Sequence, residues 1–336
     1  MELIHDSSQL RERLLRRISP GEFFALAFAF GMVGVFVWVQ SVAPYKPFFD
    51  FQNYLKTAHG DYSFYYYGYW LLPVFSALAK LPLPWSYVLW CALNIAGVFL
   101  AARIFGGNPI LAVLSYQMFY SLFQGQIAGV TVAGLALCWW GLVNRRWNIA
   151  GLGIALAAAK YQIGLTGCVL LLLLAEISWK ERLRALILPA LIVLGSLLVY
   201  PGWIGQSLHT LSGNPPSAEG SIALWRWTGP LALLFFLPPL VLPLTRDRRF
   251  IALVAATALA LPYFQQTDLL FLLALPIGWI ALLGNLGYLF VVYQWVALQA
   301  LAILPLVVYG AALSPAVVGW IKSLKAGASF GSSSSG

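Results

Sequence analysis

Charged residues are scarce in this 336-residue sequence. Asp, Glu, Lys and Arg together account for 9% of it, against about 25% in soluble globular chains. Hydrophobic residues account for 61%, and the mean hydropathy is +0.81. A water-soluble domain of this size could not hide so much apolar surface. The shortage of charge therefore excludes a soluble globular protein and indicates a membrane protein.

Motifs that bind nucleotides or catalytic metals are also absent. The sequence contains no Walker loop, dinucleotide-binding glycine pattern, metal-spaced histidine cluster or serine-nucleophile elbow. Its three cysteines lie far apart within apolar runs, where buried packing thiols are expected instead of disulfides or metal ligands: Cys91, Cys138 and Cys168. A reaction carried out by this chain would therefore use an activated substrate that is already in the membrane.

Long apolar runs are abundant. Several approach or reach the roughly 20 residues that cross a hydrocarbon core, as in residues 23–39, 86–102, 127–143, 185–200 and 268–283. Because these runs lack two-residue alternation, helices are favoured over a closed barrel. The sequence predicts an all-α polytopic membrane protein with about 10–12 membrane segments.

The distribution of Lys and Arg predicts how the chain is oriented. These residues cluster between apolar runs, at 11–17, 145–146, 180–184 and 246–249, as they do in cytoplasmic loops. The N-terminus is therefore predicted to be cytoplasmic, and the net charge of +9 is no evidence for a nucleic-acid partner. With the basic clusters inside, the turns at 159–162 and 264–268 face the outer side.

The predicted domain organisation follows from this orientation. Residues 1–20 form a basic cytoplasmic segment, residues 21–313 the membrane domain, and residues 314–336 a tail whose last six residues look like an artificial linker. Outer loops are expected at 44–66 and 201–227, and the first is rich in Tyr and Phe, which suits amphipathic helices at the interface. If every apolar segment before residue 143 crosses the membrane, Arg146 is left on the outer side, where the distribution of basic residues does not place it. Either 66–80 or 108–122 is therefore expected to be a half-helix, re-entrant or part of a neighbour.

One acidic residue stands out as a candidate catalytic group. Of the eleven carboxylates, four fall on the predicted outer side: Asp50, Asp61, Glu219 and Asp268. Asp50 lies just beyond the first helix among aromatic residues that can exclude water. Partial desolvation raises the pKa of a carboxylate, which then becomes a better general base toward a hydroxyl nucleophile.

The other three outer carboxylates have simpler explanations. Asp61 follows Gly60 and is better explained by a turn. Glu219 lies in a Gly-, Pro- and Ser-rich loop and is expected to be solvated. Asp268 begins an apolar helix, where N-capping and a role in a site are equally supported.

Further polar residues interrupt apolar surroundings. Lys160 either snorkels to the interface or, as the outer position favours, binds an anion such as a lipid phosphate. The Gln-Gly-Gln segment at 124–126 either breaks a helix or offers amides to hydroxyl groups. Arg226, between two tryptophans, is either an interface anchor or a second phosphate ligand.

Several short motifs, in this order along the chain, resemble glycosyltransferase family 87. They are an Asp soon after the first helix, Tyr66–Pro73, Leu89–Asn94, Gly125–Gln126, Arg145–Arg146 followed by Ala150–Gly151 and Lys160–Gln162, and Pro262–Leu269. The similarity covers roughly residues 20–285. It departs from the family at Ile127, where Asn is usual, and at Tyr161, where Pro is usual.

This resemblance implies a membrane enzyme of GT-C architecture, a group that includes polyprenyl-phosphate-mannose-dependent mannosyltransferases. It implies inverting transfer of a sugar, with mannose as the leading candidate, from a polyprenyl phosphate to a lipid or glycan acceptor outside the cytoplasm. Asp50 would be the general base, and Lys160, with Arg226, would bind the donor phosphate. No cofactor is required, although the scheme leaves room for a single divalent ion. The remaining candidates would bind substrate: His59, Asp61, Gln126, Gln162 and Asp268.

Two other classes of function compete with a glycosyltransferase. A transporter or lipid flippase would use the same polar residues to line the path along which its substrate crosses the membrane. Transporters, however, commonly have paired repeats and charges at the membrane midplane, whereas here the charges gather at one face and no repeat is visible. A non-catalytic scaffold would not explain a desolvated Asp beside a long aromatic loop. The enzyme is therefore favoured.

Overall fold

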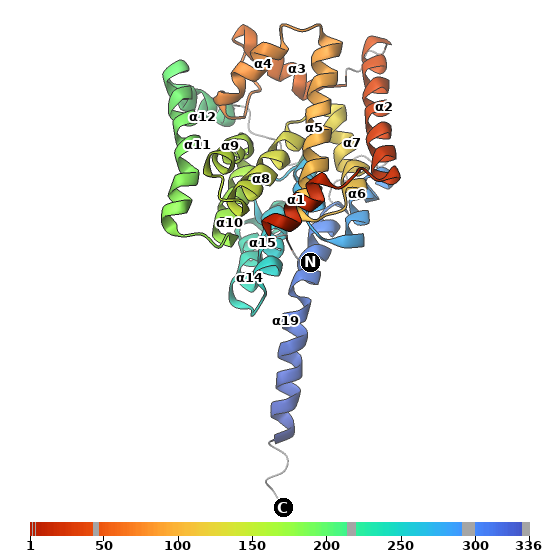
Figure 1. The fold of residues 1–336 in the computed structure, drawn as a ribbon, viewed down its shortest axis with the longest axis vertical. Helices are drawn as coiled ribbons and strands as arrows, with labels where there is room; N and C mark the ends of the chain where they lie inside the picture. The colour runs from red at the N-terminus through yellow and green to blue at the C-terminus, as the bar shows by residue number, and fades with distance from the viewer. Residues whose placement is uncertain (2, 4, 43–46, 214–219, 291–299, 331–336) are drawn as a thin grey trace, which may run out of the picture.

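The structure, a computed structural model, describes residues 1–336 except 2, 4, 43–46, 214–219, 291–299 and 331–336 (Figure 1). Within these ranges every regular element is a helix, which confirms the predicted all-α fold. Glu219, one of the four outer carboxylates, lies outside the described residues.

The first third of the chain contains two long helices and several short ones. α1 (Ser7–Leu15) begins at Asp6, whose carboxylate accepts the amide hydrogen of Ser8 and so caps the helix. The elements that follow are α2 (Pro20–Val42), α3 (Phe49–Lys56), η1 (Thr57–His59), η2 (Tyr69–Leu71), α4 (Leu72–Leu78) and α5 (Leu83–Phe105).

The middle of the chain is a series of helices separated by tight breaks. These are α6 (Pro109–Val113), α7 (Tyr116–Gln124), α8 (Ala128–Val143), α9 (Trp147–Ala158), the π-helical turn η3 (Tyr161–Leu165), α10 (Thr166–Leu174) and α11 (Trp179–Val199). Ser178 and Glu181 form a capping box at the start of α11, which satisfies amides that the helix itself cannot.

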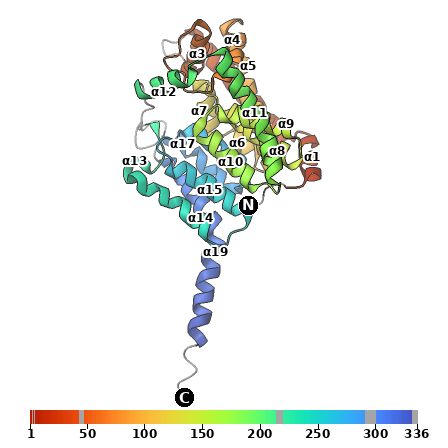
Figure 2. The ribbon, with the colours of Figure 1, turned by 90° about the vertical axis from the view of Figure 1, so that its left-hand side faces the viewer.

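The last third is more fragmented until its final helix. The elements are α12 (Trp203–Gly213), α13 (Trp225–Thr228), η5 (Gly229–Phe236), α14 (Leu237–Val241), α15 (Arg246–Ala260), η6 (Gln266–Asp268), α16 (Leu269–Ala274), η7 (Gly278–Asn285), α17 (Leu286–Phe290) and α19 (Ile303–Phe330). α19 runs through the expected domain boundary at 313–314 and projects away from the bundle (Figures 1 and 2).

Small residues bring α8 and α9 into close contact at the centre of the bundle. A Cβ added to Gly134 would lie 2.5 Å from the backbone nitrogen of Ala157, and one added to Gly153 would lie 2.3 Å from that of Cys138. Close backbone approach of this kind is how helices gain packing contacts in lipid, where burying apolar surface gives no advantage. Three free cysteines are buried, as predicted: Cys91, Cys138 and Cys168.

Fewer helices are long enough to cross a membrane than the sequence count suggested. Among the described residues three reach that length, α2, α5 and α11, and a fourth span is possible if α7 and α8 form one broken crossing. The other apolar helices are shorter, because Gly, Pro and the π turn interrupt them. The predicted count of 10–12 therefore exceeds the number of continuous spans found among the described residues.

The two segments that disturbed the crossing count are indeed irregular. Residues 69–78 form only a short apolar helix, and residues 109–124 are divided between α6 and α7. α7 and α8 meet at a bend of 118°. Figure 1 shows α3 and α4 at one end of the bundle and α14 near the other, with α2 and α5 running from the first end to the level of α1 and α6. Non-helical backbone at such a break is tolerated where it lines a cavity.

Candidate functional site

Asp50 is positioned by contacts between α3 and the break that follows α7. The backbone N–H of Phe48 donates to the carbonyl of Phe123 at 2.7 Å, and this bond holds the start of α3 against the end of α7. The indole of Trp90 in α5 donates to the carbonyl of Gly125 at 2.9 Å. Three segments far apart in the sequence therefore converge where Asp50 lies, on the first turn of α3.

Gly125 makes this convergence possible. Its φ is +68°, a conformation that favours glycine, and an added Cβ would lie 2.6 Å from Cβ of Phe51 and 3.0 Å from the Tyr87 hydroxyl. No other residue could end α7 here and still let α3 pack so closely.

Gly125→Ala is accordingly expected to destabilise the protein by about 3 kcal/mol, as the sum of left-handed backbone strain and overpacking. The measurement is the unfolding midpoint of the purified protein in detergent. Gly202→Ala is the matched control, because Gly202 has a φ of +86° with nothing within 4 Å of an added Cβ. If the two variants lose equal stability, contact with α3 does not add to the cost of the substitution at Gly125.

Asp50 lies at one end of a series of hydrogen-bonded polar side chains. Nε2 of Gln126, which is only 4% exposed, donates a hydrogen bond to Oδ2 of Asp50. The hydroxyl of Tyr67 donates to Oε1 of Gln126 at 3.4 Å, and that of Tyr54 donates to the Tyr67 oxygen at 3.1 Å. This series orients the Gln126 amide so that its N–H faces the carboxylate.

The environment of Asp50 makes its carboxylate more basic. Asp50 is half-buried in α3, outside the candidate membrane spans. Burial raises the pKa of Asp50 to about 6, and the charge of Lys160 and the hydrogen bond from Gln126 limit that rise. The two residues that the sequence placed on one side of the protein, Asp50 and Lys160, therefore lie close enough to interact electrostatically.

A polar cavity of about 230 Å³ opens beside Asp50. Most of the side chains that line it carry an amide or a hydroxyl group, which can both donate to and accept from the hydroxyls of a ligand. With Asp50 and Gln126, the residues that line it are Tyr120, Gln124, Gly220, Gln265, Gln266 and Thr267.

Lys160 lies directly behind this wall. The chain is extended at Lys160, between α9 and the π turn, and reverses so tightly that a Cβ on Gly164 would lie 1.7 Å from the Ala157 carbonyl oxygen. Nζ of Lys160 then donates to Oε1 of Gln265 at 3.1 Å and Oγ1 of Thr267 at 3.4 Å. π turns are frequent at functional sites, where they re-aim a side chain.

Lys160 is also half of a buried ion pair. Its Nζ lies 2.5 Å from Oδ1 of Asp268, and the two side chains are 2% and 1% exposed. Lys160 therefore does not snorkel to the interface. The other carboxylate oxygen of Asp268 accepts the backbone N–H of Gln265 at 3.0 Å. Asp268 thus takes part in a capping interaction at the start of η6, and its side chain is not among the described residues that line the cavity.

The other sequence candidates lie outside the lining of the cavity as far as the described residues show. Asp61 is exposed and accepts two hydrogen bonds from Ser63, a turn arrangement as its sequence position suggested. His59 is exposed beside it. Gln162 is half-buried in the π turn, and Arg226 is exposed on α13, which follows the cavity residue Gly220.

Five cavity residues were missed as individual candidates: Tyr120, Gly220, Gln265, Gln266 and Thr267. The two adjacent glutamines between an apolar helix and Asp268 were a usable signal, since amides rarely interrupt membrane helices without a role. Oε1 of Gln266 is buried without a hydrogen-bond partner among the described residues. An amide oxygen in that state is available to a ligand hydroxyl.

As for metals, no three His, Cys, Asp or Glu side chains come together as ligands would in the part of the chain that the structure describes.

Comparison with known protein families decides the class of the protein. Residues 65–283 match glycosyltransferase family 87. The chain belongs to this family. No curated protein and no solved structure matches it. The matched range of this glycosyltransferase includes Gln126, Lys160 and Asp268. It begins after α3, so the place of Asp50 in the site depends on the geometry described above.

Proposed function

We propose that this glycosyltransferase transfers a sugar, with mannose as the leading candidate, from a polyprenyl phosphate to a hydroxyl of a lipid or glycan acceptor. The observation that supports this most is the position of Asp50, a half-buried carboxylate bound by Gln126 at the wall of a polar cavity. The cavity is smaller than the roughly 300–1,000 Å³ of drug-sized pockets. It would therefore hold one sugar ring, while the lipid part of the donor stays in the membrane.

In the proposed reaction Asp50 acts as the general base. Its carboxylate takes the proton of the acceptor hydroxyl as that oxygen forms a bond to C1 of the sugar. The bond from C1 to the phosphate oxygen breaks at the same time, and the polyprenyl phosphate leaves with the bonding electrons. Attack from the face opposite the leaving group inverts the configuration at C1. Because the donor bond is already activated, the reaction needs no nucleotide.

Positive charge near the cavity would favour the leaving phosphate. Lys160 supplies it from behind Gln265 and Thr267, and Arg226 would reach the donor from α13. The remaining candidates are assigned to substrate binding: Gln126, Gln162, Asp268, Asp61 and His59. With the basic clusters in the cytoplasm, the cavity faces the extracytoplasmic side of the cell membrane.

The decisive experiment is to incubate the purified protein with a panel of polyprenyl-phosphate sugars and a lipid acceptor fraction. We expect one donor to be consumed and a glycosylated product to form. Consumption of nucleotide sugars alone would contradict the proposed donor, and movement of the lipid across vesicles without any bond cleavage would favour the flippase alternative.

The activity is also expected to depend on pH through Asp50. A general base works only in its ionised form, and burial raises the pKa of Asp50 to about 6. We therefore expect kcat/KM to fall about tenfold per pH unit below that value and to level off above it. The check is kcat/KM across this range, with unfolding midpoints at each pH as the control. A flat profile in the folded protein would remove Asp50 from the base role.

A further inference from the structure

A second and larger cavity lies where α1, the start of α2 and the end of α5 meet, away from Asp50. It has a volume of about 630 Å³, within the usual range of small-molecule sites. Its walls come from α1, the start of α2, the end of α5, α6 and the segment around Pro276. Arg103 in this cavity and Trp90 at the Asp50 site both belong to α5, and the helical rise between them is about 20 Å. The two cavities are therefore separate sites.

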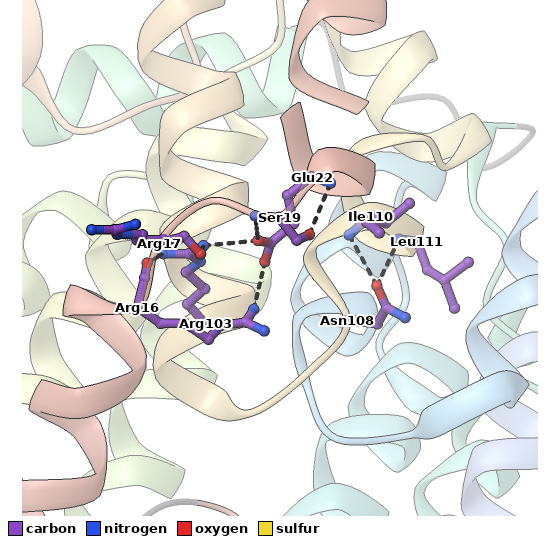
Figure 3. Close-up of polar contacts among 8 residues, drawn as sticks. All are labelled: Arg16, Arg17, Ser19, Glu22, Arg103, Asn108, Ile110 and Leu111. Carbon is purple, nitrogen blue, oxygen red and sulfur yellow. Dashed lines mark hydrogen bonds and ion pairs between the residues drawn. The ribbon is translucent and has the colours of Figure 1, made fainter. Parts of the chain in front are cut away.

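A buried ion cluster forms the floor of this cavity (Figure 3). Glu22 is only 2% exposed and is shared by two arginines, with Nη2 of Arg103 at 2.9 Å and Nη2 of Arg16 at 2.7 Å. The backbone N–H of Ser19 donates to the same carboxylate at 2.8 Å. Arg103, which is 5% exposed, also donates to the Arg16 carbonyl at 2.9 Å. These bonds hold α1 and the start of α2 against the end of α5.

Positive charge exceeds negative charge around this cavity. Of the described residues that line it, three are arginines, Arg13, Arg16 and Arg103, and one, Glu22, is acidic, so the formal balance is 3 − 1 = +2. The side chain of Arg13 makes no hydrogen bond or ion pair with the described part of the chain. Nε of buried Arg103 has no hydrogen-bond partner there either. An unpaired donor at a buried cationic group is costly unless an anion is bound nearby.

We propose that this cavity binds a phosphate-bearing anion, with the phosphate between Arg13 and Arg16. Arginine presents several N–H donors in a planar fork that matches phosphate oxygens. Only one of the Arg16 side-chain donors is used by Glu22, which leaves others for a ligand. Arg103 adds positive charge from the buried side of the cavity. The ligand is either the headgroup of an anionic phospholipid or a soluble phosphate compound.

The other walls of the cavity fit a lipid well. Pro109, Ile110 and Pro276 give it an apolar side, against which acyl chains could lie. Under the proposed orientation this cavity faces the cytoplasm, where basic pockets between membrane helices bind anionic headgroups. The proposal does not depend on the transfer reaction, because the residues and the test are different.

The test measures ligand binding by the purified full chain in a non-ionic detergent. Dioctanoyl phosphatidylglycerol is titrated by native mass spectrometry, with dioctanoyl phosphatidylcholine as the zwitterionic comparison, and inorganic phosphate is titrated separately by calorimetry. Arg13→Gln is expected to weaken binding of the anionic probe about fivefold. Arg11→Gln is the matched control, since Arg11 is an exposed arginine on the same helix that does not line the cavity.

Each outcome decides the proposal. Preferential binding of phosphatidylglycerol that depends on Arg13 supports a lipid headgroup, and binding of inorganic phosphate that depends on Arg13 supports a soluble phosphate. Absence of binding by both probes overturns the proposal. Equal weakening by Arg11→Gln and Arg13→Gln also overturns it, because the effect would then be general surface charge. Arg103→Lys provides a second variant, which keeps a positive charge beside Glu22. Because Arg103 contributes charge and not the planar fork, binding of the anionic probe should persist in it, and loss of binding at an unchanged unfolding midpoint would overturn the placement of the phosphate between Arg13 and Arg16.

Discussion

Replacing Asp50 with Asn is expected to lower kcat for sugar transfer by at least about 100-fold, while donor binding stays within about twofold of the original value. The Asn side chain has nearly the same shape, and its amide oxygen can still accept the hydrogen bond from Gln126. It cannot, however, take a proton from the acceptor hydroxyl. The measurement combines initial rates, with the donor identified from the panel, and equilibrium binding of that donor.

Two variants control for this result. Glu176→Gln makes the same carboxylate-to-amide change at an exposed position paired with Arg246, so its activity should equal that of the original protein. Asp50→Glu retains the carboxylate on a longer side chain and should retain part of the activity. Full turnover by Asp50→Asn would mean that another group removes the proton.

Replacing Lys160 with Ala is expected to weaken donor binding about tenfold or more, the loss that follows when a charged contact of about 1.5–3 kcal/mol is removed. The single variant has a second effect. It leaves Asp268 buried without its counter-ion, which costs stability of about 3–5 kcal/mol. Donor affinity and the unfolding midpoint must therefore both be measured.

A double variant separates these two effects. Lys160→Ala with Asp268→Ala removes both charges, so stability should return toward that of the original protein. If Lys160 attracts the donor phosphate, donor binding stays weak in the double variant. Recovery of both properties would mean that Lys160 only neutralises Asp268. Because the charge of Lys160 lowers the pKa of Asp50, the acidic limb of the rate profile should also move to higher pH without it.

The sequence alone supported much of the site, for identifiable reasons. Charged and amide side chains are expensive in apolar surroundings, so Asp50, Gln126, Lys160 and Asp268 could be singled out one at a time. The positive-inside pattern then predicted that the turns holding Lys160 and Asp268 share a side with the Asp50 loop. In the structure the turn before Asp268 lines the cavity beside Asp50, and Lys160 binds that turn from behind.

Pairings within the site could not be predicted in the same way. The sequence suggested a phosphate for Lys160, whereas the structure gives it Asp268 as a partner. The partner of Asp50 is Gln126, 76 positions away. Which polar groups meet depends on the left-handed turn at Gly125 and the π turn after Lys160, and neither backbone conformation is visible in a hydropathy pattern.

Composition by itself determined that this chain is a helical membrane protein, because backbone groups in lipid must bond within their own segment and apolar residues are the only ones that lipid tolerates in number. Only the tertiary structure decided which carboxylate is paired and which one faces a cavity. Ion pairs and hydrogen bonds act over a few ångströms, and distances that short between remote segments are set by how the helices break and pack.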